Sequence, residues 1–198
     1  MLAKIHSLAL LGMDCSPVEV EVDLARGISS FTIVGLGDTA VQEARERIRS
    51  AIKNTDCEFP RARVTINLAP ANWRKNGVVY DLAMAVGIML AKEFLVSPRD
   101  LQKTLFIGEL SLDGKLRHVS GVLPMISYAK EHQWERIIVP AEDAAEASLI
   151  PGIEVIAPSS LGELVRYLSG ENNLLPLKHQ VVDLEHIEYP SELDFAHI

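Results

Sequence analysis

Residues 65–90, with the strand residues just before them, constrain the fold of this chain more than any other segment. Apolar and polar side chains alternate over 63–68, which is typical of a strand with one buried face. A polar loop with Arg74 and Lys75 follows, and an almost wholly apolar helix is expected from about Tyr80. A strand that leads through a polar loop into a buried helix predicts a mixed α/β domain, and such loops often carry functional residues.

The first third of the chain is expected to form strands at 5–10, 18–23 and 31–34. Glycines and a proline separate these segments, which favours antiparallel strands joined by hairpins. A helix is expected to begin after Asp38, an N-cap residue, and to bury one apolar face as far as Ile52.

The second half has the pattern of βα repeats. Short apolar strands alternate with helical segments, which favours a parallel layer with helical crossovers. The expected strands are 105–108, 115–117, 137–139 and 154–156, and the expected helices are 122–132, 141–148 and 160–168.

The 198 residues are enough for one domain with an appendage. We therefore assign residues 1–170 to one domain and 171–198, which lack helical periodicity, to a linker or strap on its surface. No apolar run reaches the roughly 18 residues that a membrane helix requires. Two cysteines form neither a disulfide framework nor a metal site, so we expect a cytoplasmic protein without a membrane partner.

Charge is unevenly distributed, although the net charge is −8. Residues 45–75 hold eight basic side chains against three acidic ones, whereas residues 140–198 hold eleven acids against two bases. This asymmetry fits a nucleic-acid face or a contact between subunits, and it also fits a solvated helix face. The candidate contact residues are Arg45, Arg49, Trp73, Arg74 and Lys75.

The loop at Trp73, Arg74 and Lys75 is the sharpest candidate, because two cations beside an aromatic ring suit a phosphate backbone with base stacking. They suit an acidic protein surface equally well, and Trp73 can also simply anchor the loop on the core. We rank a subunit or domain contact first, nucleic acid second and loop structure third.

Other motifs favour structural roles. Gly35-Leu36-Gly37-Asp38 lacks the spacing of a phosphate-binding loop and fits a tight turn from strand to helix. The six histidines show no metal-binding spacing. Asp81 opens the apolar helix, where we expect it to cap the N-terminal amides.

The segment 65–90, together with Phe106-Ile107-Gly108-Glu109-Leu110, resembles the proteolytic domain of Lon-type proteases. This resemblance implies a ribosomal S5 domain 2-like fold, with antiparallel N-terminal strands and a βα second half (α+β / α/β). It places Val79 where those proteases have their nucleophilic Ser, and Leu123 or Pro124 where they have the Lys base. Aliphatic side chains can supply neither function, so no catalytic residue is assigned.

A second resemblance covers residues 3–195. The chain is similar there to the N-terminal domain of Mg-chelatase-like AAA+ ATPases of the ComM/YifB type. The most specific stretches are Phe31-Thr32-Ile33-Val34-Gly35-Leu36, the helix from Glu43 to Ala51, Asn67-Leu68-Ala69-Pro70-Ala71 and Asp81-Leu82-Ala83. The loop departs from that family, which usually has Asp-Leu-Pro-Lys-Glu-Gly where this chain has residues 72–77.

The second resemblance implies a hexameric, ATP-driven motor that migrates branched DNA in recombination and natural transformation. The present chain would be a non-catalytic domain for assembly or DNA engagement, with ATP and Mg²⁺ bound by an AAA+ module beyond Ile198. An active Ser-Lys peptidase and a free-standing interaction module remain as alternatives.

We predict that the 198-residue chain neither binds nor hydrolyses ATP, because it has no glycine-rich loop with a Lys and no following carboxylate for Mg²⁺. Isothermal calorimetry with ATP and Mg²⁺ should give no binding heat. Affinity at micromolar ATP would contradict the prediction.

Overall fold

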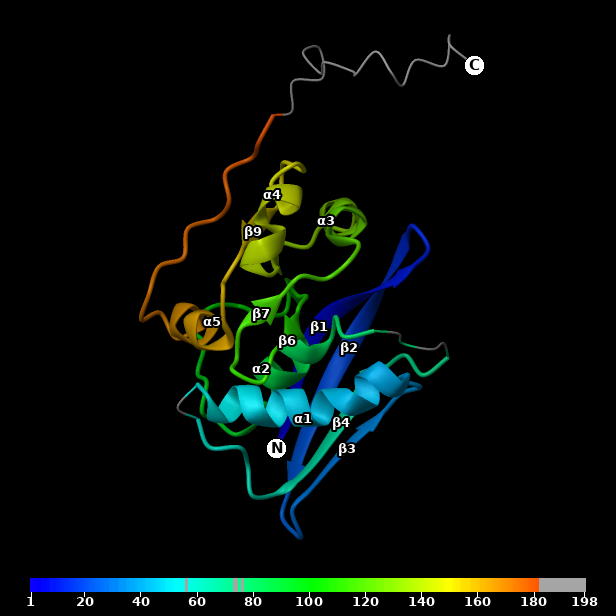
Figure 1. The fold of residues 1–198 in the computed structure, drawn as a ribbon, viewed down its shortest axis with the longest axis vertical. Coiled ribbons are helices and arrows are strands. Elements are labelled where there is room, and N and C mark those ends of the chain that lie inside the picture. The colour runs from blue at the N-terminus through cyan, green and yellow to red at the C-terminus, as the bar shows by residue number, and fades with distance from the viewer. Residues whose placement is uncertain (56, 73–74, 76, 182–198) are drawn as a thin grey trace.

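The computed structural model describes residues 1–55, 57–72, 75 and 77–181. Its main feature is one seven-stranded sheet in the order β3-β4-β2-β1-β5-β8-β9, with helices packed against it (Figure 1). Within this sheet, four of the six strand pairings are parallel and two are antiparallel. The chain is therefore a mixed α/β protein, as the alternation of strands and helices predicted.

The elements lie close to their expected places. The strands are β1 (Leu2–Leu11), β2 (Asp14–Ala25), β3 (Ser30–Val34), β4 (Arg63–Ala69), β5 (Thr104–Phe106), β6 (Glu109–Leu110), β7 (Leu116–Arg117), β8 (Arg136–Ile138) and β9 (Glu154–Ile156). The helices are α1 (Thr39–Lys53), α2 (Asp81–Ala91), α3 (Val122–Glu131), the 3-10 turn η1 (Ala141–Asp143), α4 (Ala144–Ala147) and α5 (Leu161–Leu168).

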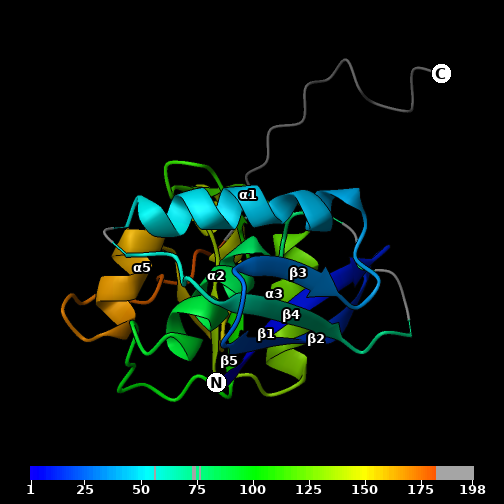
Figure 2. The same ribbon diagram turned by 90° about the horizontal axis from the view of Figure 1, so that it is seen from below.

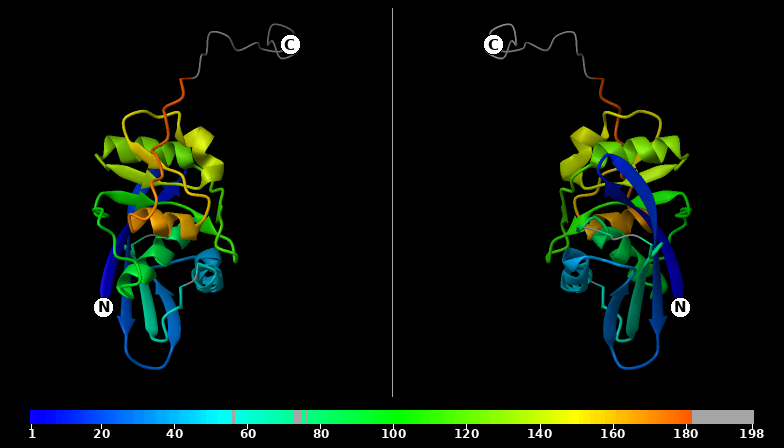
Figure 3. Two further views of the ribbon diagram at one scale, coloured as in Figure 1. Left: turned by 90° about the vertical axis from the view of Figure 1, so that its left-hand side faces the viewer. Right: turned by 90° about the vertical axis from the view of Figure 1, so that its right-hand side faces the viewer.

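The β1–β2 hairpin forms the longest ladder, running from Leu2 opposite Asp23 to Leu11 opposite Asp14. It extends along one side of the molecule (Figure 3). On β2, Val18, Val20 and Val22 are fully buried, because alternate residues of a strand face the same side. The period-two pattern of the sequence predicted this face.

The position of β3 differs from the expectation. We expected an antiparallel, hairpin-connected strand, but β3 pairs in parallel with β4, with Phe31 opposite Val64. Helix α1 connects the two, because parallel neighbours need a crossover that a tight turn cannot provide. Strand β4 is antiparallel to β2 on its other side, so the sheet is mixed at this edge.

The second half confirms the expected parallel layer. Strands β5, β8 and β9 pair in parallel, and β5 continues the sheet through one parallel pairing, His6 with Leu105 of β1. Strands β6 and β7 form a separate two-stranded ribbon. The expected helix over 141–148 is divided into η1 and α4.

Helix α2 is the centre of the core. Ten of its eleven residues are buried, and it packs on β1 and β2. Gly87 lets the helix approach the sheet, since a Cβ there would lie 2.6 Å from Val22 Cγ2. Helix α1 packs on α2 and β3 and runs across the molecule at its surface (Figure 2). In the described part of the chain, no helix is long and apolar enough to cross a membrane.

Residues 171–181 pass over the domain after α5. Leu177 N–H donates to Val155 O (2.8 Å) of β9, and Gln180 N–H donates to Ser148 O (2.9 Å). The remainder of the segment that we expected to be a linker, 182–198, lies outside the described residues.

Candidate functional site

The loop after β4 holds Lys75 inside the protein rather than on its surface. Lys75 is fully buried, and its Nζ donates to the carbonyl oxygen of Pro70 at the start of the same loop. Burial lowers the pKa of Lys75, because it disfavours the charged ammonium. The other two predicted contact residues of this loop, Trp73 and Arg74, lie outside the described residues.

Asp38 joins this loop to the turn before α1. Its side-chain Oδ1 accepts from Val41 N–H (2.9 Å), the expected N-cap, and its Oδ2 accepts from Gly77 N–H (3.0 Å). The backbones of the two loops also pair, since Lys75 N–H donates to Leu36 O and Asp38 N–H donates to Lys75 O, both at 3.0 Å. The structural role expected for the Gly35–Asp38 turn thus includes holding the loop that carries Lys75.

Glycine at position 35 has a direct physical reason. Its φ is +103°, and a Cβ at this position would lie 2.3 Å from Leu68 O on β4. A side chain would therefore collide with the backbone of the neighbouring strand. Close packing of two backbones accounts for this residue.

Beyond the loop, a hollow of about 410 Å³ opens between the start of α2 and the segment before α3. It lies where the Lon-type resemblance implies a nucleophile, and Val79 lines it. Leu123, at the implied base position, lines a different hollow beside Met13 and Tyr128. The residues around the first hollow are Leu10, Gly77, Val78, Val79, Glu109, His118, Val119, Ser120 and Met125.

Asp143, beside this hollow, fixes part of its backbone. His118 Nδ1 pairs with the buried carboxylate of Asp143, whose Oδ2 accepts from Val119 N–H (3.2 Å). The hydrogen bond to Asp143 raises the pKa of His118. Within the described residues, no hydrogen bond joins Ser120 to His118, so the hydroxyl has no adjacent base of the kind that covalent catalysis requires.

Asp81 does not cap α2 as expected. Tyr80 is the N-cap residue, without a side-chain hydrogen bond, and the Asp81 carboxylate turns to Arg47 of α1. Arg47 Nε donates to Oδ2 (2.7 Å) and Nη2 to Oδ1 (3.1 Å), while Leu110 N–H donates to Oδ2 (3.3 Å). One carboxylate therefore links α1, α2 and β6.

Burial dominates the protonation of Asp81. It raises the pKa of this carboxyl from 3.8 to about 6, although the hydrogen bonds and charge of Arg47 act in the opposite direction. The free-energy cost of removing this carboxylate from water exceeds the stabilisation that its charged form gains from one guanidinium and one backbone N–H. The same pair raises the pKa of Arg47, which stays charged.

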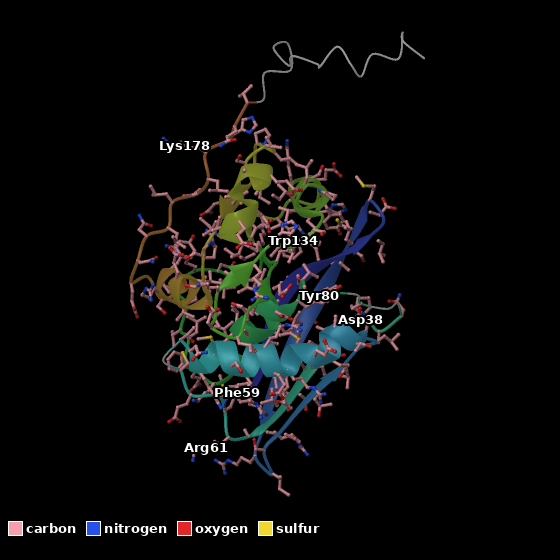
Figure 4. The ribbon with its side chains drawn as sticks, viewed as in Figure 1. Asp38, Phe59, Arg61, Tyr80, Trp134 and Lys178 are labelled. Atoms are coloured by element: carbon pink, nitrogen blue, oxygen red, sulfur yellow. The ribbon has the colours of Figure 1, made fainter. Side chains whose placement is uncertain are left out.

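The two remaining predicted contact residues lie on α1. Arg45 is exposed, and Arg49, one turn later, is half-buried with its guanidinium 5.1 Å from the centre of the Phe59 ring. Phe59 lies beneath the C-terminal half of α1, and Arg61 projects outward from the segment before β4 (Figure 4). Sequence reasoning did not select Phe59 or Arg61, because only the fold brings them to α1.

Metal binding finds no support in the described residues, where no three His, Cys, Asp or Glu side chains are grouped to hold an ion.

A family model described as subunit ChlI of Mg-chelatase matches residues 20–143, from within β2 to the end of η1. This match covers more than half of the chain. The protein belongs to the Mg-chelatase ChlI family.

Relatives agree with this assignment. The chain is 42% identical over 173 residues to Rv2897c of Mycobacterium tuberculosis, which covers 87% of the chain and 34% of the relative. It is 38% identical over 181 residues to competence protein ComM of Haemophilus influenzae (91% and 35%), and 40% identical over 173 residues to YifB of Salmonella typhimurium (87% and 34%). The chain thus spans about a third of the length of these relatives, and the ComM/YifB resemblance is confirmed.

A Lon-type protease is also among the relatives of this chain. Lon protease 2 of Bacillus subtilis is 26% identical over 178 residues, which covers 81% of the chain and 32% of that protease.

We predict that Arg47→Met destabilises the protein by about 3 kcal/mol, because it leaves a buried carboxylate without its cation. The double variant Arg47→Met/Asp81→Ala should lose less, since it removes both charges. Urea unfolding of the two single variants and the double variant measures the coupling. Arg45→Met, an exposed arginine of the same helix, is the matched control and should change stability by less than about 0.5 kcal/mol. Equal losses in Arg47→Met and the double variant would contradict the prediction.

The raised pKa of Asp81 predicts a pH dependence. Between about pH 4 and 6 the folded protein retains a proton that the unfolded chain has released, so this group lowers stability as the pH rises. The change is about 3 kcal/mol over the window, and it is complete above pH 7. Subtracting the unfolding free energy of Asp81→Asn at each pH isolates it from other carboxyls. A difference that grows in favour of the wild type between pH 4 and 6 would show that Arg47 outweighs burial.

Proposed function

We propose that this chain is a non-catalytic domain of a Mg-chelatase-like AAA+ ATPase, in which it serves assembly or DNA engagement. The whole protein would be a cytoplasmic hexamer that uses ATP to migrate branched DNA in recombination and natural transformation. Family membership supports the ATPase, and the name of the relative ComM, a competence protein, supports transformation.

The observation that carries the non-catalytic assignment is the hollow beside Val79. Its walls are mainly aliphatic, its His118 is paired with Asp143, and within the described residues its Ser120 has no hydrogen bond to that histidine. Acyl transfer needs an activated nucleophile beside a general base. The likeness to Lon protease 2 then supports a shared fold of the S5 domain 2 type without shared chemistry.

The length of the relatives supports placing nucleotide binding outside this chain. The chain spans about a third of the relatives, so ATP and Mg²⁺ would be bound by the remaining part of such a protein. Residues 1–170 would form the accessory domain, and 171–198 would lead away from it towards the motor. A free-standing interaction module is the alternative without a motor.

The prediction that tests this proposal against the peptidase alternative concerns Ser120, a hydroxyl of the hollow. We expect no hydrolysis of unfolded casein and no labelling by a fluorophosphonate acyl-trapping probe, for the wild type and for Ser120→Ala alike. An active Lon-type protease serves as the positive control. Casein hydrolysis by the wild type that disappears in Ser120→Ala would establish a peptidase and overturn the non-catalytic assignment.

A further inference from the structure

A second hollow lies at the opposite end of α1 from the loop of Lys75. Its volume is about 480 Å³, and it lies between the last turns of α1 and the segment that leads into β4. The residues around it are Arg49, Lys53, Cys57, Glu58, Phe59 and Arg61. Among the described residues, three cations and one acid line it, although the chain as a whole carries a charge of −8.

The cations of this hollow have no acidic partner within the described part of the chain. Arg47 and Arg136, by contrast, form close ion pairs with Asp81 and Glu154. Arg49 is the most constrained of the three, because its Nε is buried and meets no hydrogen-bond acceptor there. A buried N–H without an acceptor is costly, and a bound anion that draws the guanidinium towards the hollow would supply one.

Phe59 holds Arg49 in place. The guanidinium lies 5.1 Å from the ring centre, and the ring itself packs on Phe31, with 5.5 Å between the ring centres. A half-buried ring with these two contacts acts as a support for the cation, and it is poorly placed to stack on a nucleobase. The hollow is thus suited to a compact anion rather than to an aromatic ligand.

We propose that this hollow binds a phosphate group of a nucleic-acid duplex backbone. The guanidinium groups of Arg49 and Arg61 present planar N–H donors that match phosphate oxygens, and Lys53 adds a point charge. This inference rests on the proposed function, and it replaces the loop of Lys75 with the C-terminal end of α1 as the DNA-contacting surface.

Further exposed cations lie on the same two elements that border the hollow. Arg45 is exposed two turns before Lys53 on α1, and Arg63 is exposed at the start of β4. A duplex backbone offers phosphates at regular intervals, so a row of exposed cations can follow one strand without reading sequence. The few contacts and the opposing net charge make the affinity of a single copy low and sensitive to salt.

The test measures fluorescence anisotropy of a labelled duplex with the 198-residue chain at several salt concentrations. Three phosphate contacts predict a slope of log K against log salt near −3, from about −0.9 per contact. Lys53→Gln/Arg61→Gln should weaken binding by about ten-fold or more at 50 mM salt and reduce the slope by about 2. Both residues are exposed, so thermal unfolding should be unchanged.

The matched control is Lys103→Gln/Lys130→Gln, which changes the net charge equally but alters exposed lysines outside the hollow. It should retain the affinity and the slope of the wild type. Inorganic phosphate should compete with the duplex for the wild type, and polyglutamate of equal charge should compete less well.

Three results would overturn the proposal. The first is a loss that is equal in the two double variants, which would indicate general charge. The second is polyglutamate that competes as well as the duplex, which would indicate an acidic protein partner. The third is no binding at low salt and about 1 mM protein. This concentration lies above the weakest Kd, about 10⁻⁴ M, that is expected for non-specific DNA binding. None of these bears on casein hydrolysis, so failure here is distinct from failure of the non-catalytic assignment.

Discussion

The buried carboxylate of Asp81 is the constraint on which the arrangement of α1, α2 and β6 depends. An ionised group in the core must be paired, and Arg47 and Leu110 N–H provide the partners from two other elements. This requirement, together with the burial of the apolar face of α1, fixes the rotation of the helix about its own axis. With Arg47 turned inward, Arg45, Arg49 and Lys53 follow one another at four-residue spacing along another side of the helix. The buried pair therefore also helps to determine on which side of α1 the other cations lie.

Periodicity located most elements of the fold but could not assign their partners. The apolar faces of β2 and β4 and the cap of α1 by Asp38 are local properties, and each was predicted from neighbouring residues. The pairing of β3 with β4 depends instead on a helix of fifteen residues returning the chain to the sheet. Alternation identifies a strand and its buried face, whereas the direction of its neighbour is a property of the whole topology.

The site was harder to predict, because basic residues that are close in sequence have different surroundings. Arg47 and Lys75 belong to the same basic stretch as Arg45, yet one pairs with Asp81 and the other donates to a carbonyl in the interior. Sequence composition counts them all as surface charge. The prediction that Asp81 caps its helix was wrong for a similar reason. An acid at the first position of a helix commonly serves the helix amides, and the partner that it meets instead is 34 residues away.

The two hollows stand at opposite ends of one helix. Asp38 at the start of α1 holds Gly77 beside the aliphatic hollow, and Lys53 at its end lines the cationic one. Fifteen residues at 1.5 Å each separate them by roughly 22 Å, so they are too far apart to share a ligand atom. Helix α1 is held between them by Arg47 and Asp81. Residues at one end of this helix can therefore differ without altering the charge presented at the other, because the pair of Arg47 and Asp81 holds the helix between them.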